Sequence, residues 1–177
     1  YVLLADGCEI IEALAPVDMM RRANIDVKTV GVTGEIVKSS CGIDVTADMS
    51  INDFDFYDVE AIVLPGGGEG TKNLENSPAV QNAIDNAVNT NTLIAAICAA
   101  PSILGHKGIL VNKEAICFPG FEEALKGARI SNEYVVRDGS VITAKGAGVC
   151  IEFGLEIVRY IKGDEVAEKV RGTIQCQ

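Results

Sequence analysis

Short apolar runs alternate along the chain with stretches in which apolar residues recur at helical spacing. The apolar runs are typical of strands buried on both faces of a parallel sheet, and they cover residues 1–5, 27–32, 59–64 and 92–97. The helical pattern covers residues 9–23, 77–89 and 150–161. This alternation predicts an α/β sandwich, with helices around a mainly parallel sheet.

Shorter elements fill the connections. Asp138-Gly139 is a hairpin turn between apolar residues 134–137 and 141–143. We expect Pro16 to kink or split the first helix. The other predicted elements are a β excursion over 35–38 and 41–46, an irregular stretch over 48–58, a strand over 115–118, a helical turn over 122–126 and a short helix over 164–170.

Cys98 ends the buried run that begins at Thr92, and Pro101 follows in a position that suits the first turn of a helix. This order predicts a sharp strand–turn–helix geometry like a nucleophile elbow. A helix N-terminus favours a thiolate, so we expect a lowered thiol pKa. A cysteine simply buried in the core is the alternative.

Two other predicted strands are also followed by residues that could contribute to a functional site. Pro65-Gly66-Gly67-Gly68 would let backbone amides approach a ligand, although a plain tight turn is also consistent with it. Asp6-Gly7 precedes Glu9 and Glu12, which also suit the positive end of a helix. The carboxyl ends of parallel strands share one edge, so we expect these segments to meet Cys98 in a crevice.

The chain contains one histidine, His106, which lies roughly 12 Å from Cys98 along a helix. A Cys-His-Asp triad therefore cannot form within one subunit. Glu12 or Glu9 is left as the acid or base beside the sulfur. The amides of Gly67 and Ala99 are the candidate oxyanion donors, with Gly66 beside them.

Composition narrows the class of protein. The 177 residues are 48% hydrophobic, which suits one domain over residues 1–177. A net charge of −10 with interspersed signs disfavours nucleic acid and anionic membranes as partners. No run is long enough to span a membrane, and six widely spaced cysteines suit reduced thiols in the cytoplasm. The sequence predicts no metal site and no cofactor.

Four motifs together resemble the ThiJ/PfpI superfamily, and within it the parkinsonism-associated deglycase (DJ-one) branch. They are GCEIIEALAPVDMMRR from Gly7, VLPGG from Val63, AAICAAP from Ala95, and a G-x-G turn before EFGLEIV. The resemblance implies a flavodoxin-like three-layer sandwich that is commonly a homodimer. It also implies Cys98 as nucleophile, Glu12 as its protonated partner, Gly67 and Ala99 as oxyanion donors, and Cys41 near the dimer interface.

The chain departs from the family pattern at several positions. Ala99 replaces the histidine of the protease-like branch, which argues against peptidase activity. Phe118 stands where many members of the deglycase branch have a histidine, and a bacterial sub-branch similarly has an aromatic residue there. Lys145 and Ala147 replace an arginine and a proline, so we expect the shape and charge of the pocket to differ. The candidate pocket-lining residues are Cys41, Phe118 and Lys145.

Two function hypotheses follow. In the first, Cys98 attacks a 2-oxoaldehyde such as methylglyoxal, or an early glycation adduct, without glutathione, metal or cofactor. In the second, Cys98 is an oxidative-stress sensor that peroxide converts to a sulfinate next to protonated Glu12. A binding module without chemistry is a third possibility, and the sequence does not separate them.

Overall fold

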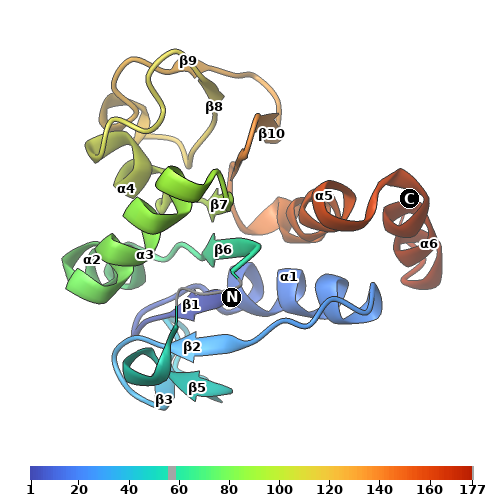
Figure 1. Ribbon diagram of the computed structural model, residues 1–177, viewed down its shortest axis with the longest axis horizontal. Coiled ribbons are helices and arrows are strands. Elements are labelled where there is room, and N and C mark those ends of the chain that lie inside the picture. Colours follow the sequence, from blue (N-terminus) through green and yellow to red (C-terminus); the bar gives the residue numbers. More distant parts are fainter. Residues whose placement is uncertain (56–58, 177) are drawn as a thin grey trace.

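A computed structural model describes residues 1–55 and 59–176. Its central sheet has the strand order β10-β11-β7-β6-β1-β2-β5, and the pairs are parallel except for β10 against β11 (Figure 1). The strands are β1 Val2–Leu4, β2 Thr29–Gly31, β5 Met49–Ser50, β6 Ala61–Leu64, β7 Leu93–Ile97, β10 Val135–Asp138 and β11 Val141–Ala144. The predicted α/β sandwich with a mainly parallel sheet is confirmed.

Helices cover both faces of this sheet. Along β7, Leu93, Ala95 and Ile97 join the apolar cluster that includes α1 (Ile10–Arg22), α5 (Cys150–Lys162) and α6 (Asp164–Thr173). Ile94 and Ala96 join the opposite cluster with α2 (Gly68–Asn76), α3 (Pro78–Thr90) and α4 (Pro101–His106). Successive side chains of a strand point to opposite faces, so one uncharged strand contributes to two cores and creates three layers.

Two small sheets lie outside the central one. β3 (Ile36–Lys38) pairs antiparallel with β4 (Asp44–Thr46), which confirms the predicted β excursion. β8 (Glu114–Ala115) pairs with β9 (Arg129–Ile130). The remaining elements are short 3₁₀ helices at Ile51–Asp53, Glu122–Ala124 and Ala147–Val149.

Several predicted elements need correction. The strand predicted over 115–118 is only Glu114–Ala115 and lies outside the central sheet. Of the predicted kink or split at Pro16, the split is wrong, because α1 continues through that buried residue, and the kink stays a prediction. Helix α2 was not expected, since its polar sequence has one buried large apolar side chain, Leu74. The irregular stretch over 48–58 contains β5, and its residues 56–58 lie outside the described part of the chain.

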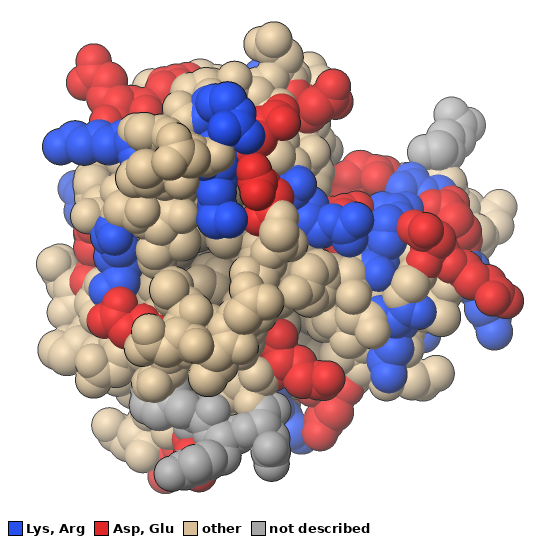
Figure 2. All heavy atoms as spheres, turned by 45° about the horizontal axis from the view of Figure 1, so that its top comes forward, with Lys and Arg blue, Asp and Glu red and all other residues tan. Residues whose placement is uncertain are grey.

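Charged side chains of both signs are interspersed over the face drawn in Figure 2. Arg159 of α5 pairs with Asp164 and Glu168 of α6, and Arg171 of α6 pairs with Glu152 of α5, so ion pairs join these two helices. None of the described helices is long and apolar enough to cross a membrane.

The contact between α1 and α5 depends on Gly154, where a Cβ would lie 2.9 Å from both Pro16 Cα and Met19 Cγ. Gly154→Ala should therefore lower the free energy of unfolding by about 1–3 kcal/mol, because overpacking outweighs the gain in helix propensity. Urea denaturation measures this change. The matched control is Gly172→Ala in α6, where a Cβ meets no atom within 4 Å, and which should stabilise by up to about 1 kcal/mol. A stabilised Gly154→Ala variant would contradict this account of the packing.

Candidate active site

Cys98 lies in a sharp turn immediately after β7, three residues before α4 begins. Its φ of 65° is in the left-handed region, which is sparsely populated for residues with a side chain. Two backbone hydrogen bonds hold it there: Cys98 N donates to Ala144 O at 2.9 Å, and Phe118 N donates to Cys98 O at 2.8 Å. The predicted turn geometry is confirmed, and the residue is half-buried rather than sealed in the core.

Glu12 reaches the same place from the first turn of α1 and is fully buried. Its Oε2 accepts a hydrogen bond from Gly66 N at 3.0 Å. The carboxyl group also interacts with the Cys98 thiol, while Oε1 makes no hydrogen bond of ordinary geometry to the described residues. Glu9 instead caps α1, since its Oε2 accepts from Glu12 N at 2.9 Å. Of the two acids left open by the sequence, Glu12 is therefore the partner of the sulfur.

The environment of Glu12 keeps this acid neutral well above the usual range. Burial raises its pKa to about 7, and the negative charge of Glu9 adds to that effect. Hydrogen bonds with Cys98 and Gly66 act in the opposite direction. At neutral pH the group can therefore both donate and accept a proton, which is what a proton relay requires.

The expectation of a lowered thiol pKa is wrong for the resting site. Burial, together with the charge and hydrogen bond of Glu12, raises the pKa of Cys98 to about 12, although the amides of Gly67 and Ala99 act to lower it. The sequence predicted the helix, the amides and a carboxyl group beside the sulfur, but it did not show how far the thiol is buried. Since the opposing charge disappears when Glu12 is protonated, the two groups share one proton and ionise as a pair.

The glycines after β6 have separate roles. The amides of Gly67 and Ala99 both reach the Cys98 sulfur, where donors for a developing oxyanion are needed. Gly66 is not an oxyanion donor, because its N–H is bound to Glu12. A Cβ on Gly66 would lie 2.5 Å from Glu12 Oε2 and 2.6 Å from Cys98 Cβ, so the close approach of the acid and the thiol requires glycine.

A hollow of about 410 Å³ has Gly146 and Phe118 in its wall but neither Cys98 nor Glu12. Its wall is formed by Phe118, Pro119, Tyr134 and the segment 145–149, which includes the predicted pocket residue Lys145. A Cβ built on Gly146 would be 3.3 Å from the Phe118 ring and 4.0 Å from Glu12 Oε1, so this wall adjoins the buried acid.

Three other side chains, those of Cys41, His106 and Cys150, are titratable groups outside the pair of Cys98 and Glu12. Cys41 lies between β3 and β4 with its Sγ 3.3 Å from Ser39 Oγ, and it is not in the wall of the hollow, so its predicted interface role stays a prediction. His106 contacts Glu75 at 2.5 Å instead of the sulfur. Cys150 was not predicted at the site. It is buried with Sγ 2.8 Å from Ala147 O, and burial and the charge of Glu12 raise its pKa to about 12.

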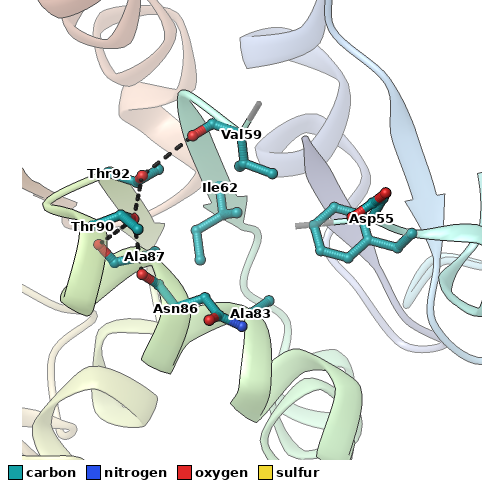
Figure 3. A pocket seen from close by; sticks show the side chains of 9 residues that line it. Asp55, Val59, Ile62, Ala83, Asn86, Ala87, Thr90 and Thr92 are labelled. Atoms are coloured by element: carbon teal, nitrogen blue, oxygen red, sulfur yellow. Dashed lines mark hydrogen bonds between the residues drawn. The ribbon is translucent and has the colours of Figure 1, made fainter. Parts of the chain in front are cut away.

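A second hollow, of about 350 Å³, lies at the other end of the strands (Figure 3). Val59 and Thr92 precede β6 and β7, and Thr92 Oγ1 donates to Val59 O at 3.2 Å. Cys98 follows the opposite end of β7, so this hollow is remote from the thiol. Among the residues that the structure describes, no group of three or more His, Cys, Asp or Glu side chains could hold a metal ion.

These features define an α/β sandwich protein whose site is a cysteine in a strained turn beside a buried carboxyl group. Residues 1–160 match the model of the DJ-1/PfpI family, and the chain belongs to that family. It is similar to the "Parkinson disease protein 7 homolog" of Danio rerio, with 38% identity over 98% of this chain and 94% of the relative.

A glyoxalase and a solved structure are also similar to this chain. The "Glutathione-independent glyoxalase DJR-1.2" of Caenorhabditis elegans is 29% identical over 93% of this chain and 88% of that relative. The crystal structure of Drosophila melanogaster DJ-1beta superposes with a TM-score of 0.94 at 32% identity, covering 99% of this chain and 96% of that one. The predicted superfamily and the flavodoxin-like fold are confirmed.

Buried Glu12 should make stability depend on pH. Its pKa is raised on folding, so the native state holds a proton that the unfolded chain releases, and stability falls as pH rises from about 4.5 to about 7. Glu12→Gln keeps the shape but removes this ionisation. The variant should therefore gain up to about 3 kcal/mol relative to the unmodified protein between pH 4.5 and 7.5, as measured by urea denaturation.

Glu9→Gln is the comparison, because it removes a nearby charge and leaves Glu12 ionisable, so a smaller dependence of stability on pH should remain. A difference between Glu12→Gln and the unmodified protein that stays constant over this pH range would contradict the raised pKa of Glu12.

Proposed function

We propose that this protein converts 2-oxoaldehydes such as methylglyoxal to 2-hydroxy acids, without glutathione or another cofactor, or repairs early glycation adducts by the same chemistry. The observation that carries the proposal is the pairing of Cys98 with a carboxyl group that titrates at about 7. The amides of Gly67 and Ala99 at the sulfur support it. The similarity to the "Glutathione-independent glyoxalase DJR-1.2" of Caenorhabditis elegans also supports it.

The reaction starts when the Cys98 sulfur attacks the aldehyde carbon. A C–S bond forms, the thiol proton passes through Glu12 to the carbonyl oxygen, and the product is a hemithioacetal. Gly67 N–H and Ala99 N–H stabilise the negative charge that develops on this oxygen. Protonated Glu12 is suited to this step because its pKa of about 7 matches the working pH.

An internal rearrangement then makes an external oxidant unnecessary. A proton moves from the former aldehyde carbon to the ketone carbon, through an enediol, with Glu12 as the carrier. The aldehyde carbon is oxidised to a thioester while the ketone carbon is reduced to an alcohol. Water hydrolyses the thioester, the C–S bond breaks, and the hydroxy acid leaves with the thiol restored.

Substitution of Cys98 should abolish turnover, whereas substitution of Glu12 should slow it. Cys98→Ser should abolish lactate formation from methylglyoxal, because no C–S bond can form. Glu12→Ala should lower kcat by about 10²–10⁴-fold, the usual contribution of a positioned acid or base. An enzymatic lactate assay measures both. Cys176→Ser is the control, since that cysteine lies after α6, and lactate formation that persists in Cys98→Ser would refute the proposal.

A redox sensor is the second candidate, and the accessible Cys98 thiol beside Glu12 and two backbone amides favours it. Cys8, Cys117 and Cys150 are buried, whereas Cys98 is half-buried. Two molecules of peroxide would oxidise the thiol to a sulfinate and release two molecules of water. Neutral Glu12 and the amides of Gly67 and Ala99 would stabilise the anionic product.

This candidate predicts an order of oxidation. Cys98 should reach the sulfinate before Cys41, although Cys41 is the more exposed thiol, because the donors around Cys98 stabilise the oxidised product. Peptide mass spectrometry after graded peroxide treatment measures the order, with Glu12→Ala as the comparison. Earlier oxidation of Cys41 would contradict the sensor.

The predicted homodimer would cover apolar side chains that one chain leaves exposed. Ile11 of α1 and Ile151 of α5 are 49% and 39% exposed, and α1 and α5 pack against each other. A second copy would remove such side chains from water. The dimer and the single domain over residues 1–177 stay predictions.

A further inference from the structure

The hollow beside Glu12 has the size and lining of a small-molecule site. Its volume of about 410 Å³ falls within the range of about 300–1,000 Å³ that is usual for such sites. Apolar atoms make up most of its wall. Methylglyoxal presents only one methyl group beyond its two carbonyls, so it would leave most of this apolar surface without a contact.

The wall of the hollow is continuous with the reaction centre. Phe118 N–H donates a hydrogen bond to Cys98 O at 2.8 Å, so the backbone of the aromatic residue lies directly against the backbone of the cysteine. Ala147 and Val149 pack in the same apolar cluster as Cys98. Glu12 Oε1, which lacks an ordinary hydrogen bond to the described residues, lies on the Gly146 side of the pair.

Two aromatic side chains give the wall its character. Phe118 is 47% exposed and Tyr134 is 61% exposed, which leaves large apolar surfaces in water at one concave place. Lys145 Nζ lies 4.9 Å from the centre of the Tyr134 ring. This cation–π contact holds the ammonium group over an aromatic face.

From this arrangement we propose that the preferred substrates are 2-oxoaldehydes with a bulky apolar group, such as a phenyl ring, on the ketone carbon. The inference rests on the function proposed above. The aldehyde carbon meets Cys98, and the apolar substituent occupies the hollow against Phe118 and Tyr134. The reaction is otherwise the same, so phenylglyoxal and water yield mandelate.

Steady-state kinetics with phenylglyoxal and methylglyoxal test this assignment, with Cys98→Ser subtracted to remove non-catalytic reaction of phenylglyoxal. We expect kcat/KM to favour phenylglyoxal by at least about tenfold, since one methylene in an apolar pocket is already worth about 10–200-fold. Phe118→Ala and Tyr134→Ala should lower the value for phenylglyoxal by a larger factor than the value for methylglyoxal, so that the ratio of the two falls. Phe121→Ala is the matched control, because this exposed aromatic residue is close in sequence but absent from the wall.

A binding measurement tests the hollow without turnover. Calorimetric titration of the Cys98→Ser variant should give tighter binding of mandelate than of lactate, and Phe118→Ala in that background should remove the difference. Equal affinities, or Cys98-dependent turnover without preference for phenylglyoxal, would overturn this inference and leave the proposed function standing. That is also the result expected if a second copy of the chain covers the hollow. Absence of any Cys98-dependent turnover would refute the proposed function instead.

Discussion

The buried carboxyl group of Glu12 is the constraint on which the rest of the site depends. An acid that is fully removed from water is costly unless it is neutral or hydrogen-bonded, and here both conditions are used. Gly66 N–H binds one oxygen, the Cys98 thiol faces the group, and the raised pKa keeps a proton available near pH 7. Replacing this acid with a permanent charge or an apolar side chain would remove the buried group whose raised pKa, about 7, suits proton transfer near neutral pH.

The turns after β6 and β7 meet around that acid, and both contribute backbone amides beside the Cys98 thiol. The turn after β6 contributes the amides of Gly66 and Gly67, and the turn after β7 contributes the amide of Ala99. The unusual φ of Cys98 directs its sulfur to these donors, and hydrogen bonds to Ala144 and Phe118 maintain that conformation. Because amides of a rigid sheet edge need little reorganisation, they suit the stabilisation of a transient oxyanion.

The hollow next to the site differs in chemistry from the pair formed by Cys98 and Glu12. In the proposed reaction, Glu12 and Cys98 act on the carbonyl group of the substrate. Phe118, Tyr134 and the segment 145–149 form an apolar wall for the group that is attached to this carbonyl. Phe118 occupies a position where the resemblance implies a histidine in many relatives. The aromatic ring therefore presents apolar surface where a histidine could carry a proton, and the proposed reaction assigns proton transfer to Glu12.

The sequence by itself determined the alternation of strands and helices, the turn at Cys98 and the absence of a histidine partner, because periodicity, proline position and composition are local properties. It did not reveal α2, whose polar sequence is stabilised by packing at Leu74, or the position of residues 114–115 outside the main sheet. The family resemblance implied Glu12, and the tertiary structure places Glu12 at the sulfur and Glu9 at the helix cap. Only the tertiary structure engages the Gly66 amide with that acid and raises the thiol pKa instead of lowering it. These outcomes depend on burial and on distances between residues far apart in the chain, which no local pattern contains.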